Sequence, residues 1–415
     1  MLSLQPQGPF MSSLRRRVLY LPGYDPLPPR RYRELYRREG DQQAAISGYA
    51  LTMGARKDRT GFGWGVTGEF PEGRTETEIE VLVWADLVQG SMGQGILTTY
   101  GQLARTAWAY IGSGALFRLM RLRRGPVIAA LYPIVVLVLQ LLLALLAGWL
   151  VGWGVARFGS WWLGLPVMAG VTWAGLIGWR RLDGRLFAYY LMHDYAFTAQ
   201  GGGEYPEALE ERIARFADRI AEVLAEGWDE VLVVCHSSGA YLAVSVLADL
   251  IRDGRVPKGA ALSLLTLGHV VPMASFLPRA ERLRHDLRFL STRDEIFWLD
   301  VTAPGDACSF GLCDPVAVTG VATPAQKHPL VISAAYTRTL SPEKQRALRG
   351  RWFRLHFQYL CAFDRPGDYD YFAITAGPLT LAERFAGRAP SPGRITTPAG
   401  PGLSGPGLSG PGLAA

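Results

Sequence analysis

The chain has 415 residues, of which 49% are hydrophobic, and a formal net charge of +7. This hydrophobic fraction is high for a soluble enzyme and predicts that part of the chain lies in lipid. The positive charge comes almost entirely from arginine, because lysine occurs only at Lys57, Lys258, Lys327 and Lys344. Arginines that gather beside an apolar segment are explained by membrane topology and anionic headgroups, so we expect no nucleic-acid partner.

The first part of the chain, residues 15–99, has the pattern of several strands and one helix. The run RRRVLYLPGYDP places a short apolar strand before Pro22 and Gly23, and Arg30 to Ala45 has the spacing of an amphipathic helix. Aromatic residues and glycines at 46–70 indicate a strand pair, and ETEIEVLVWADLV predicts the next strand. Residues 1–14 are interpreted as a flexible lead that lacks the apolar run of a signal peptide.

Residues 100–197 are predicted to be an insertion that carries two uncharged stretches. The first stretch extends from Gly125 to Ala156 and the second from Phe158 to Trp179. Both are long enough to cross a hydrocarbon core of about 30 Å as helices, so we expect transmembrane helices near residues 126–152 and 160–179. A re-entrant or interfacial helix is the alternative for the second stretch, because its glycines and Pro166 lower helix propensity.

Arginines flank both outer ends of this pair, whereas only Arg157 lies between the two stretches. The flanking residues are Arg118, Arg121, Arg123, Arg124, Arg180, Arg181 and Arg185. Positive residues remain in the cytoplasm, which predicts an integral inner-membrane protein with a hairpin and both termini cytoplasmic.

The four cysteines are expected to be free thiols, since disulfides are rare in the cytoplasm. They are Cys235, Cys308, Cys313 and Cys361. The pair Cys308 and Cys313 lacks the spacing of a zinc site and no second pair accompanies it, so we expect no metal. No phosphate loop or dinucleotide fingerprint is visible, so no cofactor is expected either.

Residues 198–388 alternate predicted helices with apolar strands. Apolar residues recur on one face of Pro206 to Glu226, as in a helix, and VLVVC, ALSLLTLG and IFWLDVTA have the composition of buried strands. Buried strands in β-α-β order predict an α/β fold with a mostly parallel sheet that helices cover on both faces. The Gly/Pro-rich residues 389–415 are expected to be a disordered tail.

The stretch VLVVCHSSGAYLAV, Val231 to Val244, is typical of a nucleophile elbow, in which a reactive serine occupies a sharp strand-to-helix turn. Cys235 and Gly239 stand where the usual Gly-x-Ser-x-Gly motif has glycines, and His236 and Ser238 flank Ser237. Small side chains are needed at the outer positions because the strand and helix backbones approach closely. The alternative is an ordinary buried strand followed by a capped helix.

Three stretches together resemble the α/β-hydrolase superfamily. LYLPGYDP is similar to its oxyanion-loop strand, VLVVCHSSGA to its elbow, and TAPGDACSFGLCDPV to its acid loop. The resemblance covers most of residues 15–375 apart from the membrane insertion. It implies a hydrolase-like sheet and the chain order serine, acid, histidine, with oxyanion N–H groups from Tyr24, in the loop that Gly23 opens, and from Ser238.

Two histidines, His328 and His356, follow the acid loop and are candidates for the base. His356 in FRLHFQYL lies among apolar and aromatic residues, and its H-x-x-Y pattern resembles that around the base of lipase-like members, so we favour it. His328 in QKHPL is the alternative. A hydrogen-bonded core histidine is the non-catalytic interpretation of either.

For the acid, Asp306 is preferred because it follows a strand directly, in a loop that can aim a carboxylate back towards the serine. Asp314 resembles the family's Asp-Pro-Val acid and is the alternative, whereas Asp300 lies inside an apolar strand and is interpreted as structural.

These residues predict a lipase- or esterase-like serine ester hydrolase anchored at the cytoplasmic membrane face. Its partners would be the bilayer and a lipid-like acyl ester or thioester. An acyltransferase that uses the same triad, or a non-catalytic membrane-anchored binding module, is the alternative.

Overall fold

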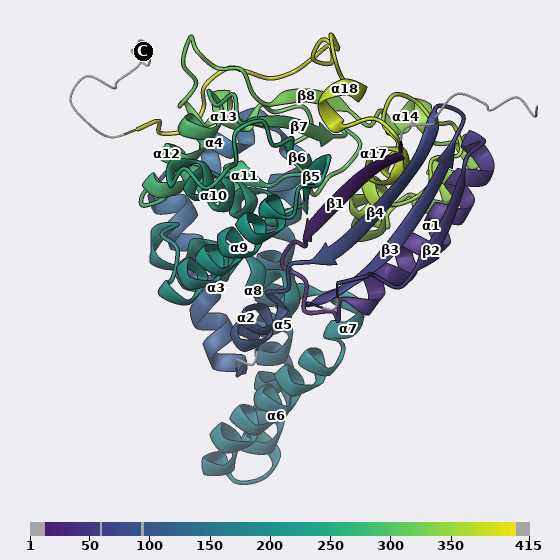
Figure 1. The fold of residues 1–415 in the computed structure, drawn as a ribbon. Helices are drawn as coiled ribbons and strands as arrows, with labels where there is room; N and C mark the ends of the chain where they lie inside the picture. The colour runs from purple at the N-terminus through teal and green to yellow at the C-terminus, as the bar shows by residue number, and fades with distance from the viewer. Residues whose placement is uncertain (1–12, 59, 93–94, 404–415) are drawn as a thin grey trace, which may run out of the picture.

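The structure is a computed structural model that describes residues 13–58, 60–92 and 95–403. Its body contains one eight-stranded sheet in the order β2-β3-β4-β1-β5-β6-β7-β8, and two long helices project from the body (Figure 1). The strands are β1 (Ser13–Leu21), β2 (Ala50–Gly54), β3 (Phe62–Phe70), β4 (Gly73–Val81), β5 (Glu230–His236), β6 (Leu262–Leu267), β7 (Ile296–Thr302) and β8 (Leu330–Ser333). The β2–β3 and β3–β4 pairs are antiparallel and the other pairs are parallel.

Helices cover both faces of this sheet, because alternate residues of its central strands point to two separate cores. Leu19 of β1 packs with α9 (Glu207–Ala225), α10 (Gly239–Arg252) and α12 (Glu281–Leu290). Val18 packs on the opposite face with α1 (Arg30–Ser47), α14 (Tyr336–Thr339) and α17 (Tyr371–Ala376). The prediction of an α/β fold with a mostly parallel, two-sided sheet is therefore confirmed.

The remaining helices are short or belong to the projecting part. They are α2 (Ala85–Met92), α3 (Ile96–Gly112), α4 (Ala115–Leu122), α5 (Arg124–Phe158), α6 (Trp161–Arg181), α7 (Asp183–Leu186), α8 (Ala188–Ala199), η1 (Gln200–Gly202), α11 (Val271–Ser275), α13 (Pro315–Thr319), α15 (Pro342–Leu348), α16 (Trp352–His356), η2 (Phe357–Leu360) and α18 (Leu381–Arg384).

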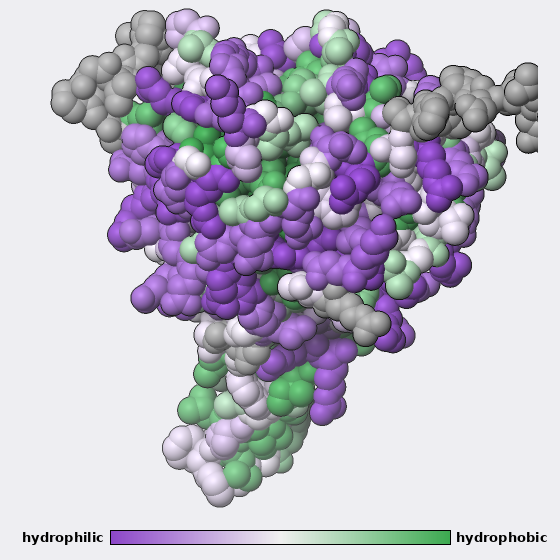
Figure 2. All heavy atoms as spheres, viewed as in Figure 1, coloured by the Kyte–Doolittle hydropathy of each residue, from purple (hydrophilic) through white to green (hydrophobic). Residues whose placement is uncertain are grey.

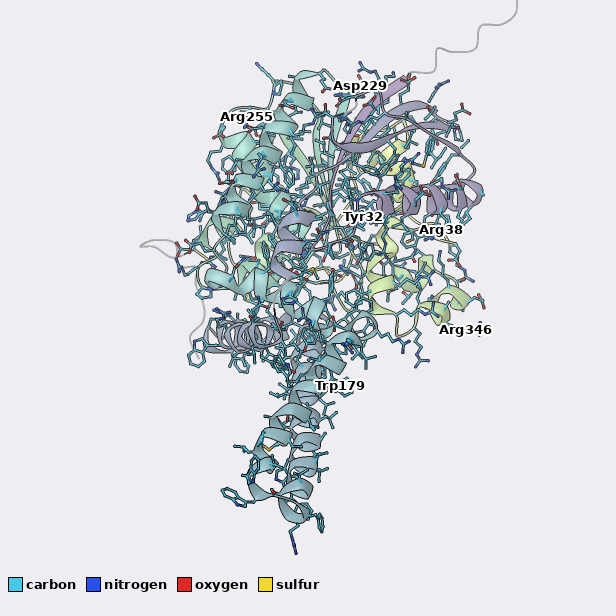
Figure 3. The ribbon with its side chains drawn as sticks, turned by 90° about the horizontal axis from the view of Figure 1, so that it is seen from below. Tyr32, Arg38, Trp179, Asp229, Arg255 and Arg346 are labelled. Carbon is cyan, nitrogen blue, oxygen red and sulfur yellow. The ribbon has the colours of Figure 1, made fainter. Side chains whose placement is uncertain are left out.

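Helices α5 and α6 form an antiparallel pair that matches the predicted ranges 126–152 and 160–179, and both are long and apolar enough to cross a membrane. Figure 2 shows the apolar surface of this pair beneath a largely hydrophilic body, and in Figure 3 Trp179 lies where α6 reaches the body. The pair packs through small residues. A Cβ atom added to Gly152 would lie 2.6 Å from the Gly164 carbonyl oxygen, so only glycine permits this approach.

The segment 389–403 differs from the expected disordered tail, because it packs on the body. The Ser391 N–H donates to the Val331 carbonyl at 2.9 Å, and Ile395 N–H donates to the Leu312 carbonyl at 2.8 Å. Backbone hydrogen bonds to the body hold this segment in place. The Gly/Pro-rich composition could not indicate these bonds. Residues 404–415 of the expected tail lie outside the described residues, as do residues 1–12 of the lead.

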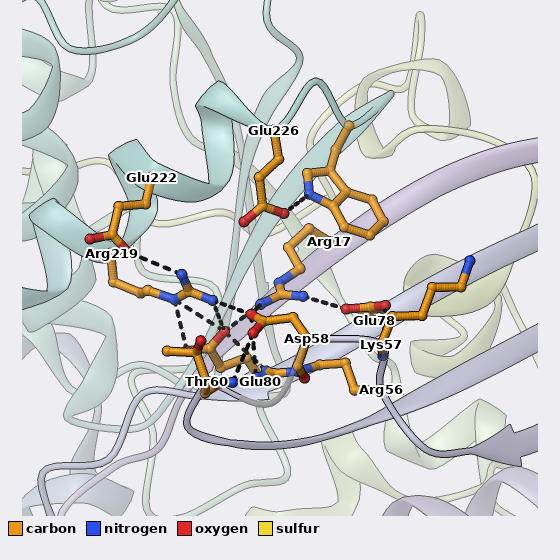
Figure 4. Close-up of polar contacts among 11 residues, drawn as sticks. Arg17, Arg56, Lys57, Asp58, Thr60, Glu78, Glu80, Arg219, Glu222 and Glu226 are labelled. Carbon is orange, nitrogen blue, oxygen red and sulfur yellow. Dashed lines mark hydrogen bonds and ion pairs between the residues drawn. The ribbon is translucent and has the colours of Figure 1, made fainter.

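A buried cluster of three guanidinium and three carboxylate groups joins β1, β4, the β2–β3 loop and α9 (Figure 4). The Glu80 carboxylate accepts from Arg17 at 2.6 Å, Arg56 at 3.0 Å and Arg219 at 2.9 Å. Asp58 and Glu78 complete the cluster and balance its charge. Because Glu80 is shared by all three arginines, it holds the central strands and α9 together.

We expect Glu80→Gln to destabilise the protein by about 3 kcal/mol, because the three guanidinium groups of the cluster would then share only the two carboxylates of Asp58 and Glu78. Glu76→Gln is the matched control, since Glu76 pairs with Lys57 on the surface. Thermal unfolding in detergent, followed by circular dichroism, measures both variants. Equal unfolding temperatures for the two would show that the cluster contributes no net stability.

Candidate functional site

Ser237 occupies the turn between β5 and α10, in the left-handed region at φ 56°. This conformation is unusual for a residue with a side chain and is the one that a nucleophile elbow imposes. Two backbone hydrogen bonds hold it: the Ser237 N–H donates to the Leu267 carbonyl at 2.9 Å, and the Ala240 N–H donates to the Ser237 carbonyl at 3.1 Å. The turn thus has the backbone geometry that the motif predicts.

The small residues around Ser237 are required by close backbone contacts. A Cβ atom on Gly239 would lie 2.6 Å from the Leu21 carbonyl oxygen, and one on Gly23 would lie 3.0 Å from the Ser237 Cβ. Cys235 is fully buried, with its Sγ 3.5 Å from the Leu265 carbonyl oxygen. A small thiol therefore fits where the usual motif has its first glycine.

His356 and Asp306 form a buried pair at the same edge of the sheet. The His356 Nδ1–H donates to the Asp306 Oδ2 at 2.7 Å. The other Asp306 oxygen accepts from the Cys308 N–H at 2.9 Å, and the Tyr359 hydroxyl donates to Oδ2 at 3.1 Å. Burial disfavours the Asp306 carboxylate, but His356, with the Cys308 N–H, outweighs it and lowers the pKa of Asp306 below its usual value.

His236 positions the segment that carries His356. Its Nε2–H donates to the His356 carbonyl at 3.0 Å, and the two imidazole rings lie 4.5 Å apart. Burial, together with neighbouring His356, lowers the pKa of His236 to about 3, so its ring stays neutral. The sequence placed His236 in the elbow but did not indicate this supporting contact.

The alternative acid and base lie elsewhere. Asp314 caps α13 by accepting from the Val316 and Ala317 N–H groups at 3.0 and 3.1 Å. His328 accepts from the Trp298 N–H at 3.5 Å, near the start of β7 and hence at the opposite edge of the sheet. Neither borders the cavity that contains Ser237 and His356.

The expected oxyanion hole is only partly open. The Tyr24 N–H donates to the Ser238 Oγ at 2.7 Å, so this donor is occupied, which differs from the prediction. The Ser238 hydroxyl, whose role the motif does not specify, is the acceptor. The Ser238 N–H has no acceptor among the residues that the structure describes. Rotation of the Ser238 hydroxyl would release the second donor.

Ser237 and His356 both border a cavity of about 470 Å³. Aromatic and aliphatic residues of α8 and α16 form much of its wall. The first turns of α5 contribute Pro126, Ala129 and Tyr132, so the apolar pair begins at the cavity itself.

Asp194 of α8 also borders this cavity and was not identified from the sequence. Burial raises the pKa of Asp194 to about 7, and His356 partly counteracts this shift. In the sequence, the only indication of this residue is that a single acid interrupts the aromatic stretch AYYLMHDYAF. Asp194 thus places a second ionisable group beside the candidate base.

In comparisons with protein-family models, curated proteins and solved structures, no match to this chain was found. Among residues 13–58, 60–92 and 95–403, no group of three or more His, Cys, Asp or Glu side chains could hold a metal ion. The interpretation of the site therefore depends on its own geometry.

We expect Asp194→Asn to stabilise the protein at pH 8 but not at pH 4. The folded-state pKa of about 7 lies above that of an unfolded aspartate, about 3.9, so ionising Asp194 removes stability as the pH rises between these values. The difference in unfolding temperature should grow across this interval and level off above pH 7. Thermal unfolding of both proteins at each pH measures it, and a difference independent of pH would contradict the assigned pKa.

Proposed function

We propose that the protein is a membrane-anchored serine ester hydrolase of the α/β-hydrolase type, with Ser237, His356 and Asp306 as its triad. The main support is one arrangement: Ser237 at φ 56° and the His356–Asp306 pair, 2.7 Å apart, meet at a single cavity. Strands β4, β1, β5, β6, β7 and β8 form a continuous parallel sheet. Ser237 and Asp306 follow β5 and β7 at its carboxyl edge, and His356 lies close to Gly268 after β6.

In the proposed reaction the Ser237 Oγ attacks the acyl carbonyl carbon. Asp306 binds the Nδ1–H of His356, which leaves Nε2 as the nitrogen that takes the serine proton. Collapse of the tetrahedral intermediate breaks the ester bond, and His356 returns the proton to the departing alcohol or thiol. Water then attacks the acyl-enzyme with His356 as base, and the carboxylic acid leaves as Ser237 regains its proton.

The N–H group of Ser238, together with that of Tyr24 once the Ser238 hydroxyl turns away, would stabilise the oxyanion. Asp306 fixes the imidazole tautomer and stabilises the imidazolium, and Tyr359 holds the carboxylate in turn. Tyr359 and His236 are positioning residues in this account.

A lipid-like substrate is supported by the wall that α5 contributes to the cavity. If α5 and α6 span the bilayer, the cavity opens near the headgroups and an amphiphile can enter without crossing water. The flanking arginines support a hairpin with the body and both termini on the cytoplasmic side. The same acyl-enzyme would also serve transfer to an alcohol or amine.

We expect Ser237→Ala and His356→Ala each to lower hydrolysis of p-nitrophenyl hexanoate on the order of 10⁴-fold, because triad members act as a unit. Asp306→Asn should also lower turnover severely, since the carboxylate that holds His356 in its Nδ1–H tautomer would be lost. Asp314→Asn and His328→Ala are matched controls away from the cavity and should cost little. If Ser237→Ala retains wild-type turnover, the nucleophile is wrong; if no ester is cleaved by folded wild-type protein, the binding-module alternative is favoured.

A further inference from the structure

Three arginines lie around the cavity of Ser237 and His356. Arg185 of α7 comes from the segment after the apolar pair, whereas Arg351 and Arg354 belong to the segment that ends at His356. All three are exposed, and their guanidinium groups have no carboxylate partner among the described residues. We call them the arginine rim.

Aromatic side chains lie between these arginines and are also exposed. Phe187 is 43% exposed, Trp352 43% and Phe353 36%. The Phe187 and Phe353 rings are 5.4 Å apart, and the Trp352 ring lies 6.3 Å from that of Tyr132 in α5. These contacts bring the segment of His356 against both α5 and the α7–α8 junction.

The position of the rim relates it to the membrane surface. Arg185 follows α6 by only a few residues, and Trp352, between the other two arginines, contacts Tyr132 in the first turns of α5, so the rim lies beside the base of the projecting pair. Arginine and amphipathic aromatic residues gather at the headgroup level of membrane proteins. The residue types and the location of the rim thus suit contact with lipid headgroups at the entrance to the cavity.

The carboxyl groups of the cavity do not neutralise the rim. Asp25 is buried, and it accepts from the Tyr32 hydroxyl at 2.7 Å and from the Leu27 N–H at 2.9 Å. Asp194 lies on α8, beside His356 rather than among the exposed residues. The entrance is therefore cationic, which favours an anion and disfavours a cationic headgroup.

We propose that the arginine rim is a phosphate subsite and that the substrate class is an acyl ester with an anionic phosphate headgroup; this deepens the proposed function and rests on it. A guanidinium group binds phosphate oxygens with two parallel N–H donors. Phosphate held by Arg185, Arg351 and Arg354 would direct the ester carbonyl towards Ser237, with the acyl chain along the apolar wall of α5 and α8.

The first test measures headgroup preference of the full-length protein in neutral detergent. The preference is the ratio of kcat/KM for dihexanoyl phosphatidic acid to that for dihexanoyl phosphatidylcholine. Wild type should prefer the anionic ester, and the double variant Arg351→Gln/Arg354→Gln should lose about tenfold of this ratio, mainly through KM. Arg74→Gln/Arg338→Gln, which removes the same charge at exposed positions away from the cavity, should retain it. Equal preference in wild type and rim variant would overturn the subsite.

The second test needs no catalysis. Calorimetric titration of the Ser237→Ala protein with dihexanoyl phosphatidic acid should show binding that weakens at least tenfold with both rim substitutions added. Rim-dependent binding with no turnover by the wild type would support the phosphate subsite and overturn the hydrolase activity. Turnover by the wild type with binding that does not depend on the rim would support the hydrolase activity and overturn the subsite. Competition by inorganic phosphate only far above the lipid concentration supports an amphiphilic ligand, and competition at equal concentration overturns it.

Discussion

The close approach of the loop after β1 to the turn after β5 determines the rest of the site. β1 and β5 are parallel neighbours with Leu21 opposite Cys235, so their carboxyl ends meet at the same edge. Gly239 lies so close to the Leu21 and Pro22 carbonyl groups that no larger residue fits there. This contact forces the chain into a sharp turn, and Ser237 takes the left-handed conformation that exposes its side chain to the cavity.

The same constraint extends to the base and the acid. A Cβ atom on Gly268, directly after β6, would lie 3.2 Å from the His356 Cε1 and 2.6 Å from a Tyr359 ring carbon. The segment 356–360 therefore rests against the ends of β5 and β6, and it aims His356 at Asp306 after β7. Backbone packing at one sheet edge, supported by the His236 and Tyr359 hydrogen bonds, assembles the site before any substrate is present.

Local patterns predicted much of this arrangement. Apolar runs located β5, β6 and β7, the uncharged stretches located α5 and α6, and the spacing after β7 favoured Asp306 over Asp314. Long-range contacts could not be predicted in this way. Nothing local to RRRVLYL places β1 between β4 and β5, and the bond between the Tyr24 N–H and the Ser238 hydroxyl joins positions 214 residues apart. Asp194 reaches the cavity only through the packing of α8, and Ser391 is ordered by β8 rather than by its own composition.

Covalent labelling most directly tests whether Ser237 is a nucleophile that His356 activates. Detergent-solubilised protein is incubated with a fluorophosphonate, digested, and analysed by mass spectrometry. We expect one adduct, on the peptide that contains Ser237, which forms much more slowly in the His356→Ala variant and at an unchanged rate in His328→Ala. A folded wild-type protein that remains unlabelled, or an adduct on another serine, would contradict it.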